Sequence, residues 1–297
     1  MIITLEMIFC NSNIELALEN ILSKRDGCGI DGIRISDFEE YWKINGDVII
    51  DNIMNGNYKP NIVQEVQIIN SKRKKRTISK FTTTDRLILR ALQQILEPYI
   101  EELMYSNSFA YRDGFGVGAA VQKAADYIEE GDKWVAEIDI YNFFDNIPID
   151  RMEAMLSELV NNEDTIVFIK NFLRCRVELS GTIRTKDIGL VQGSSISPIL
   201  SNYYLTVIDR FLEENEYHAV RYGDNIDIYT KTDTEAADIY KIISDKIEKL
   251  DLRVNHKKSG IFEAVNRRSL GYQFTQDKKT KKVIASKFKN NTESYNA

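Results

Sequence analysis

Hydrophobic and polar positions along the chain predict an interleaved series of helices and short strands. Apolar residues recur at helical spacing in the stretches 13–23, 36–54, 117–130, 149–160, 163–173 and 195–215. Strand-like alternation or short apolar runs occupy 63–69, 134–140, 252–254, 260–263 and 270–274. Two hairpins are expected at 177–185 and 218–230, and a third, with a positively charged tip, is expected to run from 63–69 over residues 72–76 to Thr77-Ile78. This mixture predicts an α+β protein in which antiparallel sheets pack on helices.

Capping and breaking residues predict where several helices begin and end. Thr84-Asp85 would cap a strongly amphipathic helix, which Pro98 would end or kink. Ser197-Pro198 is a typical helix start, because a proline in the first turn loses no hydrogen bond. Thr232-x-x-Glu235 is a capping box that opens a helix ending near Leu250.

The composition is that of a globular protein. The chain has 297 residues, of which 43% are apolar and 28% charged, enough for one large domain or two closely packed ones. Cys10, Cys28 and Cys175 form no CxxC pair and no metal-ligand spacing, which predicts reduced, buried thiols in a cytoplasmic protein. Glu6 interrupts the apolar segment 1–10, which lacks the basic start of a signal peptide, and no window has the length of a membrane span.

Charge is distributed unevenly. The net charge of −6 argues mildly against a protein that wraps a long nucleic acid, since basic side chains drive binding to phosphates. The run Lys72-Arg73-Lys74-Lys75-Arg76 is nevertheless strongly basic. A second basic cluster comprises Lys278, Lys279, Lys281, Lys282, Lys287 and Lys289. On charge alone, a solvated loop and a binding surface are equally good interpretations of the run.

Two aspartates stand where strands end. In the strand 134–140, Asp139 and Glu137 share one face, opposite the apolar residues. Asp224 lies at the tip of the second hairpin, between Gly223 and Asn225. Each aspartate alone is more simply an exposed strand-end or turn residue. Together they are the residue type that holds a pair of divalent ions for phosphoryl transfer.

The order of seven short segments resembles that of the reverse transcriptases of group II introns and their bacterial relatives. The segments are Lys74-Lys75-Arg76, Ser108-Phe109-Ala110-Tyr111-Arg112, Asp139 to Asp145, Val191 to Pro198, Tyr222-Gly223-Asp224-Asn225, Asn255-His256-Lys257-Lys258 and Leu270-Gly271-Tyr272. Each is weakly specific alone, but the ordered set across about residues 24–275 is a strong signal. Retron-type, abortive-infection and phage-defence enzymes are among the relatives without introns.

The resemblance implies a right-hand polymerase with fingers and palm. Residues 1–105 would be mainly fingers, and residues 106–275 would be palm with an inserted fingers segment at about 146–190. Residues 276–297 would form a basic C-terminal extension, which leaves a thumb that is lacking or minimal and no maturase or endonuclease domain. Either the sequence is a fragment of a longer protein, or a structured non-coding RNA or a second protein subunit would supply the clamp on the duplex.

The resemblance also implies template-directed addition of dNTPs to a primer on an RNA template, with two Mg²⁺ ions. Asp139 and Asp224, with Asn225 and the backbone of Ile140, would ligate the ions. Lys258 would donate a proton to pyrophosphate, unless it is an ordinary surface lysine. The incoming nucleotide would contact Lys75, Arg76, Arg112, Phe144, Gln192 and Gly193. Template and primer would contact Lys72, Arg73, Lys74, Tyr222, Gly271 and Tyr272.

Two adjacent aromatic residues have different expectations. By the resemblance, Phe144 would clash with a ribose 2′-hydroxyl and so select dNTPs over NTPs. Core packing is the alternative for Phe144, and it is the preferred interpretation for Phe143. The two histidines, His218 and His256, are too few for a histidine metal site, and both are expected to be incidental.

Several residues depart from the family pattern. Asn225 stands where these enzymes have a second aspartate, and an amide offers an oxygen without the charge that a hard cation prefers. The site would keep a reduced activity, with a preference for Mn²⁺, or it would be inactive. Asp227, on the same side of the strand, is a candidate to compensate. Ser79-Lys80-Phe81 replaces a usual Gly-Ile-Pro and Val191 a usual proline, which indicates a divergent lineage.

Three functions remain open from the sequence. The first is an RNA-directed DNA polymerase of a group II intron-derived or anti-phage defence system. The second is a catalytically impaired polymerase fold that acts as a scaffold for RNA or protein partners. The third is a template-independent nucleotidyltransferase, because the same metal chemistry serves both kinds of polymerase.

Overall fold

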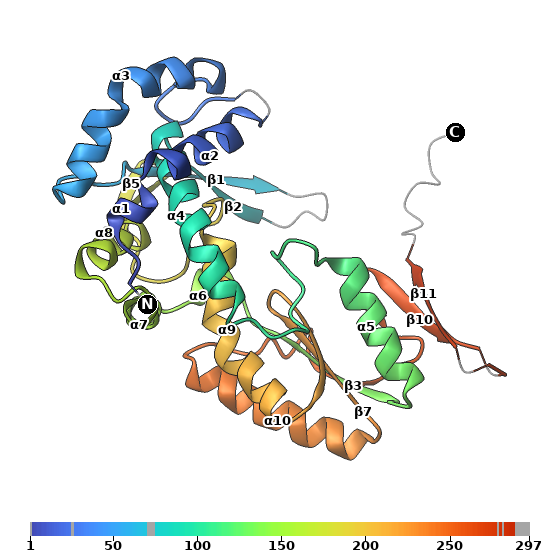
Figure 1. The fold of residues 1–297 in the computed structure, drawn as a ribbon. Coiled ribbons are helices and arrows are strands. Elements are labelled where there is room, and N and C mark those ends of the chain that lie inside the picture. Colours follow the sequence, from blue (N-terminus) through green and yellow to red (C-terminus); the bar gives the residue numbers. More distant parts are fainter. Residues whose placement is uncertain (1, 25–26, 70–74, 278, 281, 289–297) are drawn as a thin grey trace, which may run out of the picture. The chain divides into compact units, whose positions relative to one another are not determined.

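The computed structural model describes residues 2–24, 27–69, 75–277, 279–280 and 282–288 (Figure 1). The chain divides into two compact units. The first comprises Met1–Leu103 and Phe144–Tyr204, and the second comprises Met104–Phe143 and Leu205–Ala297. Their assignment as fingers and palm, with the boundaries given above, stays a prediction. Some of the basic residues singled out above lie outside the described residues, namely Lys72, Arg73, Lys74, Lys278, Lys281 and Lys289.

The first unit combines helices with a four-stranded sheet of order β2-β1-β4-β5. Its strands are β1 (Val63–Ile69), β2 (Lys75–Lys80), β4 (Arg176–Leu179) and β5 (Thr182–Thr185). Neighbouring strands are antiparallel except β1 and β4, which run parallel. The helices are α1 (Leu5–Ile8), α2 (Asn11–Leu22), α3 (Ile35–Met54), α4 (Thr83–Glu101), α7 (Ile149–Val160) and α8 (Glu163–Leu173). Two further helices, α6 (Phe143–Asn146) and α9 (Ser197–Glu214), span the division between the units.

The second unit is built on an antiparallel sheet of order β6-β7-β3-β8. The strands are β3 (Trp134–Asp139), β6 (His218–Tyr222), β7 (Asn225–Thr230) and β8 (Gly260–Glu263). A smaller sheet contains β9 (Arg268–Ser269), β10 (Tyr272–Gln276) and β11 (Val283–Lys287). Two helices pack on these strands, α5 (Val117–Glu129) and α10 (Asp233–Lys249). None of the helices in the described part of the chain combines the length and the apolar character needed to cross a membrane.

The two faces of the larger sheet are covered differently. Val135 and Tyr229 oppose each other across β3 and β7, and both belong to an apolar cluster with α5, β10 and β11. Because side chains alternate along a strand, the intervening apolar residues point to the other face, and α10 packs on β3, β7 and β8. Glu137 and Asp139 share the face of Val135. The acidic end of β3 therefore continues beyond the apolar cluster on the same face.

Helix α4 differs from its predicted boundaries at both ends. Thr82, not Thr84, is the capping residue, and its hydroxyl accepts a hydrogen bond from the amide of Asp85 at 3.0 Å. Pro98 does not end the helix, which continues to Glu101. A proline removes one hydrogen bond of the helical ladder, and in the last turn this loss leaves the rest of the helix intact.

Three strands differ from the predictions because strand pairing depends on residues far apart in the sequence. Residues 252–254 make a single bridge, between Val254 and Ile140, and not a strand, because this segment lies beside only the end of β3. The expected strand 270–274 begins only at Tyr272, as β10, because Leu270 and Gly271 both have positive φ and form the turn that follows β9. Strand β11 was not predicted, since its pairing with β10 has no local signal in a lysine-rich segment.

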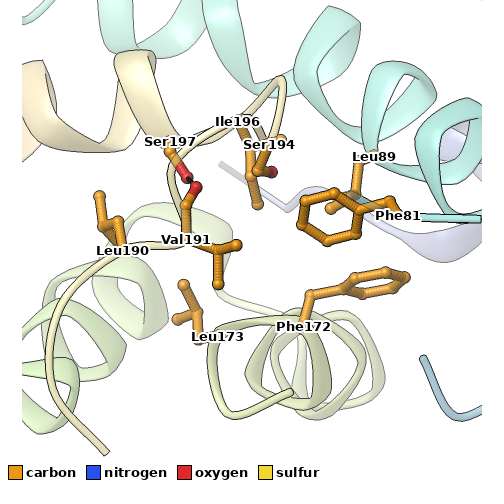
Figure 2. A pocket seen from close by; sticks show the side chains of 9 residues that line it. All are labelled: Phe81, Leu89, Phe172, Leu173, Leu190, Val191, Ser194, Ile196 and Ser197. Atoms are coloured by element: carbon orange, nitrogen blue, oxygen red, sulfur yellow. Dashed lines mark hydrogen bonds between the residues drawn. The ribbon is translucent and has the colours of Figure 1, made fainter. Parts of the chain in front are cut away.

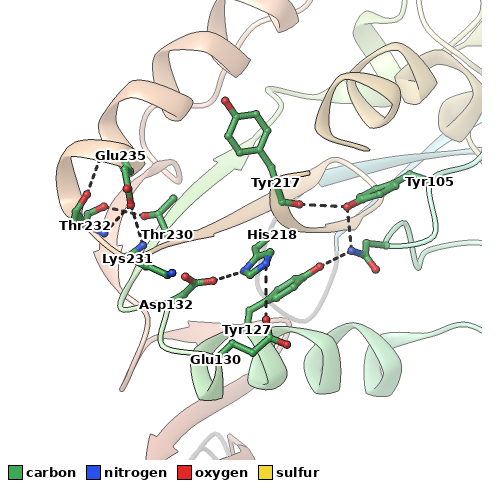
Figure 3. Close-up of polar contacts among 11 residues, drawn as sticks. Tyr105, Tyr127, Glu130, Asp132, Tyr217, His218, Thr230, Lys231, Thr232 and Glu235 are labelled. Atoms are coloured by element: carbon green, nitrogen blue, oxygen red, sulfur yellow. Dashed lines mark hydrogen bonds and ion pairs between the residues drawn. The ribbon is translucent and has the colours of Figure 1, made fainter. Parts of the chain in front are cut away.

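Both histidines have structural neighbours. In the network of Figure 3, His218 Nδ1 lies 2.6 Å from Asp132 Oδ2, and the imidazole stacks on the ring of Tyr127 at 4.3 Å. His256 Nδ1 lies 3.3 Å from the hydroxyl of Tyr240. The Asp132–His218 pair stands at the start of β6, at the opposite end of the hairpin from Asp224.

The prediction of buried thiols is right for one cysteine of three. Cys175 is buried, whereas Cys10 and Cys28 are exposed. Cys10 is the residue that precedes α2, and Cys28 lies in a loop outside the helices and strands, so neither is part of a packed core.

The buried carboxylate of Asp85 should be important for the stability of the first unit. It accepts hydrogen bonds from the hydroxyls of Thr82 and Tyr58 and from the backbone and side chain of Asn61. Asp85→Ala should lower the free energy of unfolding by about 2–3 kcal/mol, because these donors lose a common acceptor. Urea denaturation followed by circular dichroism measures the change. Asp37→Ala, at an exposed first-turn acid of α3, is the matched control, and an equal loss there would contradict the role of Asp85.

Candidate active site

Strands β3 and β7 bring the two predicted aspartates together. In their antiparallel pairing Asp139, the last residue of β3, lies opposite Asn225, the first residue of β7. Asp224 immediately precedes Asn225, and its carbonyl accepts a hydrogen bond from the amide of Ile140 at 3.3 Å. The charge of Asp139 also shifts the pKa of Asp224. Residues far apart in the sequence thus place two carboxylates at one end of the sheet.

A tight turn presents Asp224. Strand β6 ends at Tyr222 and β7 begins at Asn225, and these two residues pair, so Gly223 and Asp224 form a two-residue loop. Gly223 has a φ of +64°, a conformation that glycine adopts without strain and that two-residue hairpin loops require. The loop is therefore short and fully determined by the two strands that it joins.

The carboxylate of Asp139 has two side-chain partners. Lys258 Nζ lies 2.7 Å from Oδ2, and Asn255 Nδ2 donates to Oδ1 at 2.8 Å. The backbone carbonyl of Asp139 accepts from the amide of Asn255 at 2.7 Å, and its amide donates to the hydroxyl of Ser259 at 2.9 Å. Lys258, and not the adjacent Lys257, is therefore the lysine that reaches the site. Asn255 and Ser259 were missed as site residues, although the Asn-x-x-Lys segment was a signal for the first.

Asp224 lies in an electrostatically unfavourable position. Burial raises the pKa of its carboxyl group above the ordinary value, and the charge of Asp139 raises it further, whereas Lys258 lowers it. Two poorly solvated carboxylates repel each other, and a divalent cation would remove this repulsion.

The available donor atoms fit such a cation. Carboxylates, the amide oxygen of Asn225 and the backbone carbonyl of Ile140 are the hard oxygen ligands that Mg²⁺ and Mn²⁺ accept. Among the residues that the structure describes, no three His, Cys, Asp or Glu side chains form a metal-binding group. The two carboxylates would therefore need neutral oxygens, or oxygens of the substrate, to complete the coordination of an ion.

A polar pair, one member buried and the other half-buried, lies next to the site on the same face of the sheet. Glu137 and Asp227 oppose each other across β3 and β7. Arg267 makes two hydrogen bonds to Glu137, at 2.7 and 2.6 Å, and the hydroxyl of Ser269 donates to Asp227 at 2.7 Å. Burial, and secondly the charge of Glu137, raises the pKa of Asp227 to about 7. That Asp227 compensates for Asn225 stays a prediction.

Phe144, Gln192 and Gly193, like Lys75 and Arg76, belong to the first unit. Asp139 and Asp224, the acidic group, belong to the second unit. Gln192 Nε2 donates to Asp145 Oδ1 at 3.1 Å, and the carbonyl of Gln192 accepts from the amide of Ser79 at 3.0 Å. Gly193 has a φ of +105°, and a Cβ there would lie 2.9 Å from the carbonyl oxygen of Ser79. Only glycine fits this approach to β2, the strand that also contains Lys75 and Arg76.

Apolar side chains pack around Val191, the residue that precedes Gln192 and Gly193 (Figure 2). Val191 packs with Phe81 and Phe172 around a cavity of about 10 Å³, which is room for one water molecule at most. The hydroxyl of Ser197 donates to the carbonyl of Val191 at 2.8 Å. Valine, at the position where a proline was expected, is thus a buried packing residue.

Four predicted binding residues lie in the second unit, namely Arg112, Tyr222, Gly271 and Tyr272. The guanidinium of Arg112 donates to two carbonyls of its own loop and stacks 4.0 Å above the ring of Phe115. Tyr222 and Tyr272 pack against the apolar cluster of α5. Gly271 has a φ of +82° and open space around it. Phe143 is buried, which confirms the packing role expected for it.

A family model decides the relationship of the chain to known proteins. The model described as "Reverse transcriptase (RNA-dependent DNA polymerase)" matches residues 59–274, which is more than half of the chain. The chain belongs to the reverse transcriptase family. This reverse transcriptase has an α+β fingers-and-palm fold, as the sequence predicted, and the match includes the acidic group and the Gln192–Gly193 segment.

The reverse transcriptase has relatives encoded by introns. It is 27% identical to "Group II intron-encoded protein LtrA" of Lactococcus lactis subsp. cremoris, over 66% of this chain and 33% of that protein. It is 24% identical to "Protein YkfC" of Escherichia coli (strain K12), over 63% of this chain and 50% of that protein. The chain thus spans half or less of the length of these curated relatives.

Solved structures show the same fold. A chain described as "Partial Cas6-RT-Cas1--Cas2 complex" matches the reverse transcriptase with a TM-score of 0.50 and 23% sequence identity. The match covers 83% of this chain and 41% of that chain. At this level of identity, the likeness concerns the fold alone.

The raised pKa of Asp227 predicts a dependence of stability on pH. Because its pKa is about 7 in the folded protein against an ordinary 3.8, the folded state keeps a proton that the unfolded state releases. Stability should therefore fall by on the order of 4 kcal/mol between about pH 4 and pH 7 on account of this group. Asp227→Asn, which mimics the protonated acid, should remove this loss in urea denaturation at about pH 5 and pH 8. Asp238→Asn, at an exposed aspartate of α10, should keep the wild-type dependence, and a wild-type profile for Asp227→Asn would contradict the assignment.

Proposed function

We propose that the chain is an RNA-directed DNA polymerase that adds dNTPs to the 3′ end of a primer. The observation that carries the proposal is the β3–β7 register, which puts Asp139 opposite Asn225 and beside Asp224. Membership of the reverse transcriptase family supports the same reaction. The raised pKa of Asp224 supports it as well, because a site built to receive cations brings carboxylates together at an energetic cost.

Two Mg²⁺ ions, or Mn²⁺ in their place, would be held by Asp139, Asp224, the amide oxygen of Asn225 and the carbonyl of Ile140. Such ions activate the attacking hydroxyl and stabilise charge on the phosphates. Lys258, whose ammonium lies 2.7 Å from Asp139 Oδ2, would donate a proton to the leaving pyrophosphate. Asn255 would hold the carboxylate of Asp139 in place through its hydrogen bond to Oδ1.

The predicted nucleotide-binding residues would select and orient the incoming dNTP. Gly193 lets the nucleotide approach the backbone, since it has no side chain. Phe144 would exclude the ribose 2′-hydroxyl by contact. Lys75, Arg76 and Arg112 would attract the triphosphate. Template and primer would contact Lys72, Arg73, Lys74, Tyr222, Gly271 and Tyr272.

A partner would assist the chain in binding a duplex. The net charge of −6 gives weak electrostatic attraction for a long nucleic acid. A structured non-coding RNA or a second protein subunit would supply the missing contacts. The intron-encoded relatives and the neighbour described as part of a Cas6-RT-Cas1--Cas2 complex support a role in a group II intron-derived or anti-phage defence system.

A catalytically impaired scaffold for RNA or protein partners is the second candidate, and one feature favours it. Asn225 brings no charge, and the ammonium of Lys258 already neutralises one oxygen of Asp139. Both facts lower the affinity for a cation relative to a site with three carboxylates. If Asn225 limits the activity, Asn225→Asp should raise extension in Mg²⁺.

Primer extension separates these candidates. Wild-type protein should extend a DNA or RNA primer on an RNA template with Mg²⁺ or Mn²⁺, and Asp224→Ala should reduce the rate by at least about a hundredfold because one carboxylate ligand is lost. Asp238→Ala, at an exposed aspartate of α10, is the matched control and should keep the wild-type rate. Equal background signals from wild type and Asp224→Ala would favour the scaffold. Sequenced products that ignore the template, or that form without one, would show a template-independent enzyme.

Phe144 should determine the choice of sugar. Phe144→Ala should raise the incorporation of rNTPs relative to dNTPs by about tenfold or more, because the contact that rejects a 2′-hydroxyl is removed. The ratio of kcat/KM for rGTP and dGTP on one template measures this, and the ratio cancels any loss of folded enzyme. An unchanged ratio would assign Phe144 to packing alone.

A further inference from the structure

A fully buried ion pair contacts the Gly223–Asp224 turn. Arg221, near the end of β6, has an exposed fraction of 0%, and so does Asp209 of α9. Arg221 Nε donates to Asp209 Oδ1 at 2.6 Å, and Nη2 donates to Asp209 Oδ2. The remaining terminal nitrogen, Nη1, donates to the carbonyl of Gly223 at 3.1 Å. No local pattern predicts this pair, because its members are 12 residues apart on different elements.

Stability alone is a poor explanation of such a pair. Removing two charges from water costs several kcal/mol for each ion, and a well-packed apolar pair of the same volume is often equally stable or more so. An apolar pair, however, cannot provide a directed donor to a backbone carbonyl. The flat guanidinium does so, since two of its nitrogens are fixed by the carboxylate and the third is thereby aimed at Gly223.

The carbonyl of Gly223 belongs to the peptide group that also contains the amide nitrogen of Asp224. Holding this carbonyl fixes the plane of the peptide and therefore the rotation that sets the direction of the Asp224 side chain. The following peptide is held from the other side, because the carbonyl of Asp224 accepts from the amide of Ile140 at 3.3 Å. Both peptide groups that flank Asp224 are thus anchored.

We propose that the Arg221–Asp209 pair is a positioning device that aims the Asp224 carboxylate toward Asp139. The proposal rests on the polymerase function proposed above, since it assigns the pair a purpose in that reaction. Neither residue would touch the substrate or the ions. The pair acts through the Gly223–Asp224 peptide, which loses one of its anchors when the guanidinium is absent.

The backbone of Arg221 makes a separate connection that the experiment must leave intact. Its amide donates to the carbonyl of Asn107 and its carbonyl accepts from the amide of Phe109, both at 2.9 Å. Substitution of the side chain preserves these bonds. A change in the turn can then be attributed to the guanidinium and not to the loss of the neighbouring segment.

The principal variant replaces both charges together. Arg221→Met with Asp209→Leu fills the same space and leaves no unpaired buried charge, so it should fold with the wild-type circular dichroism spectrum. In primer extension kcat should fall by about tenfold to a hundredfold, because a small misplacement of a reacting group has an effect of this size. KM for the dNTP should stay within about threefold of wild type.

Two further variants separate positioning from charge and from general destabilisation. Arg221→Lys retains the charge opposite Asp209 but cannot satisfy both the carboxylate and Gly223, so it should share the loss of kcat. Asp132→Asn with His218→Gln removes a polar pair at the far end of the same hairpin, and kcat should remain within about twofold of wild type. Full activity of Arg221→Lys would overturn the proposal, since charge alone would then suffice.

Two measurements that require no catalysis test independently whether the Arg221–Asp209 pair positions the turn. Hydrogen exchange of the Ile140 amide, measured by mass spectrometry with fragmentation, should be about tenfold faster in the double variant, whereas the amides of β3 near Val135 should be unchanged. The affinity of the protein for Mn²⁺ alone, measured by electron paramagnetic resonance, should fall in parallel. Wild-type exchange and wild-type Mn²⁺ affinity in the double variant would overturn the proposal. If wild type extends no primer, the polymerase function fails, but the exchange and Mn²⁺ measurements still decide the role of the pair.

Discussion

The register between β3 and β7 is the constraint on which the candidate site depends. It places Asp139 opposite Asn225 and makes Gly223 and Asp224 the loop. Because side chains alternate along a strand, a slip of one residue would send Asp139 to the face that α10 covers and Ile138 to the open face. The apolar residues on both faces oppose such a slip. The core of the second unit therefore fixes the position of the carboxylates, although it lies away from them.

The face that carries Asp139 changes in character along β3. Val135 and Tyr229 are packed in the apolar cluster of α5. The next pair is polar: Glu137 is half-buried and bonded to Arg267, and Asp227 is buried and bonded to Ser269. The last pair is Asp139 and Asn225, and Asp224 immediately precedes Asn225 in the chain. The intermediate pair separates a dry core from a site that must admit ions and substrate. Burial of Asp227 lowers the stability of the protein at neutral pH, because it raises the pKa of this carboxyl group to about 7.

Local patterns predicted the elements well, and long-range pairing limited the rest. Periodicity located β3 and α10, and the capping box at Thr232 is present with both of its hydrogen bonds. The parallel contact of β1 with β4 had no local signal, because it joins residues more than a hundred positions apart. Asp139 and Asp224 could be named from the sequence through their place in the ordered segments that resemble the family, since each alone is also an ordinary strand-end or turn residue. Arg221 could not, because an arginine in a strand is ordinarily exposed and only the tertiary structure buries it.

The balance of charge explains what Asn225 does to this site. Asp139, Asp224 and Lys258 together carry a net charge of −1, and an aspartate at position 225 would make it −2. That extra carboxylate would stand in register with Asp139, next to Asp224, whose pKa is already raised by burial and by the charge of Asp139. Without a cation, asparagine is therefore the less strained residue, and with a cation it is the weaker ligand. Asparagine at position 225 therefore lowers the affinity for cations and raises the stability of the turn when no cation is bound. With one carboxylate fewer to hold close together, the main effect of the hydrogen bonds that anchor this turn, including that of Arg221, is to set the direction of the Asp224 carboxylate.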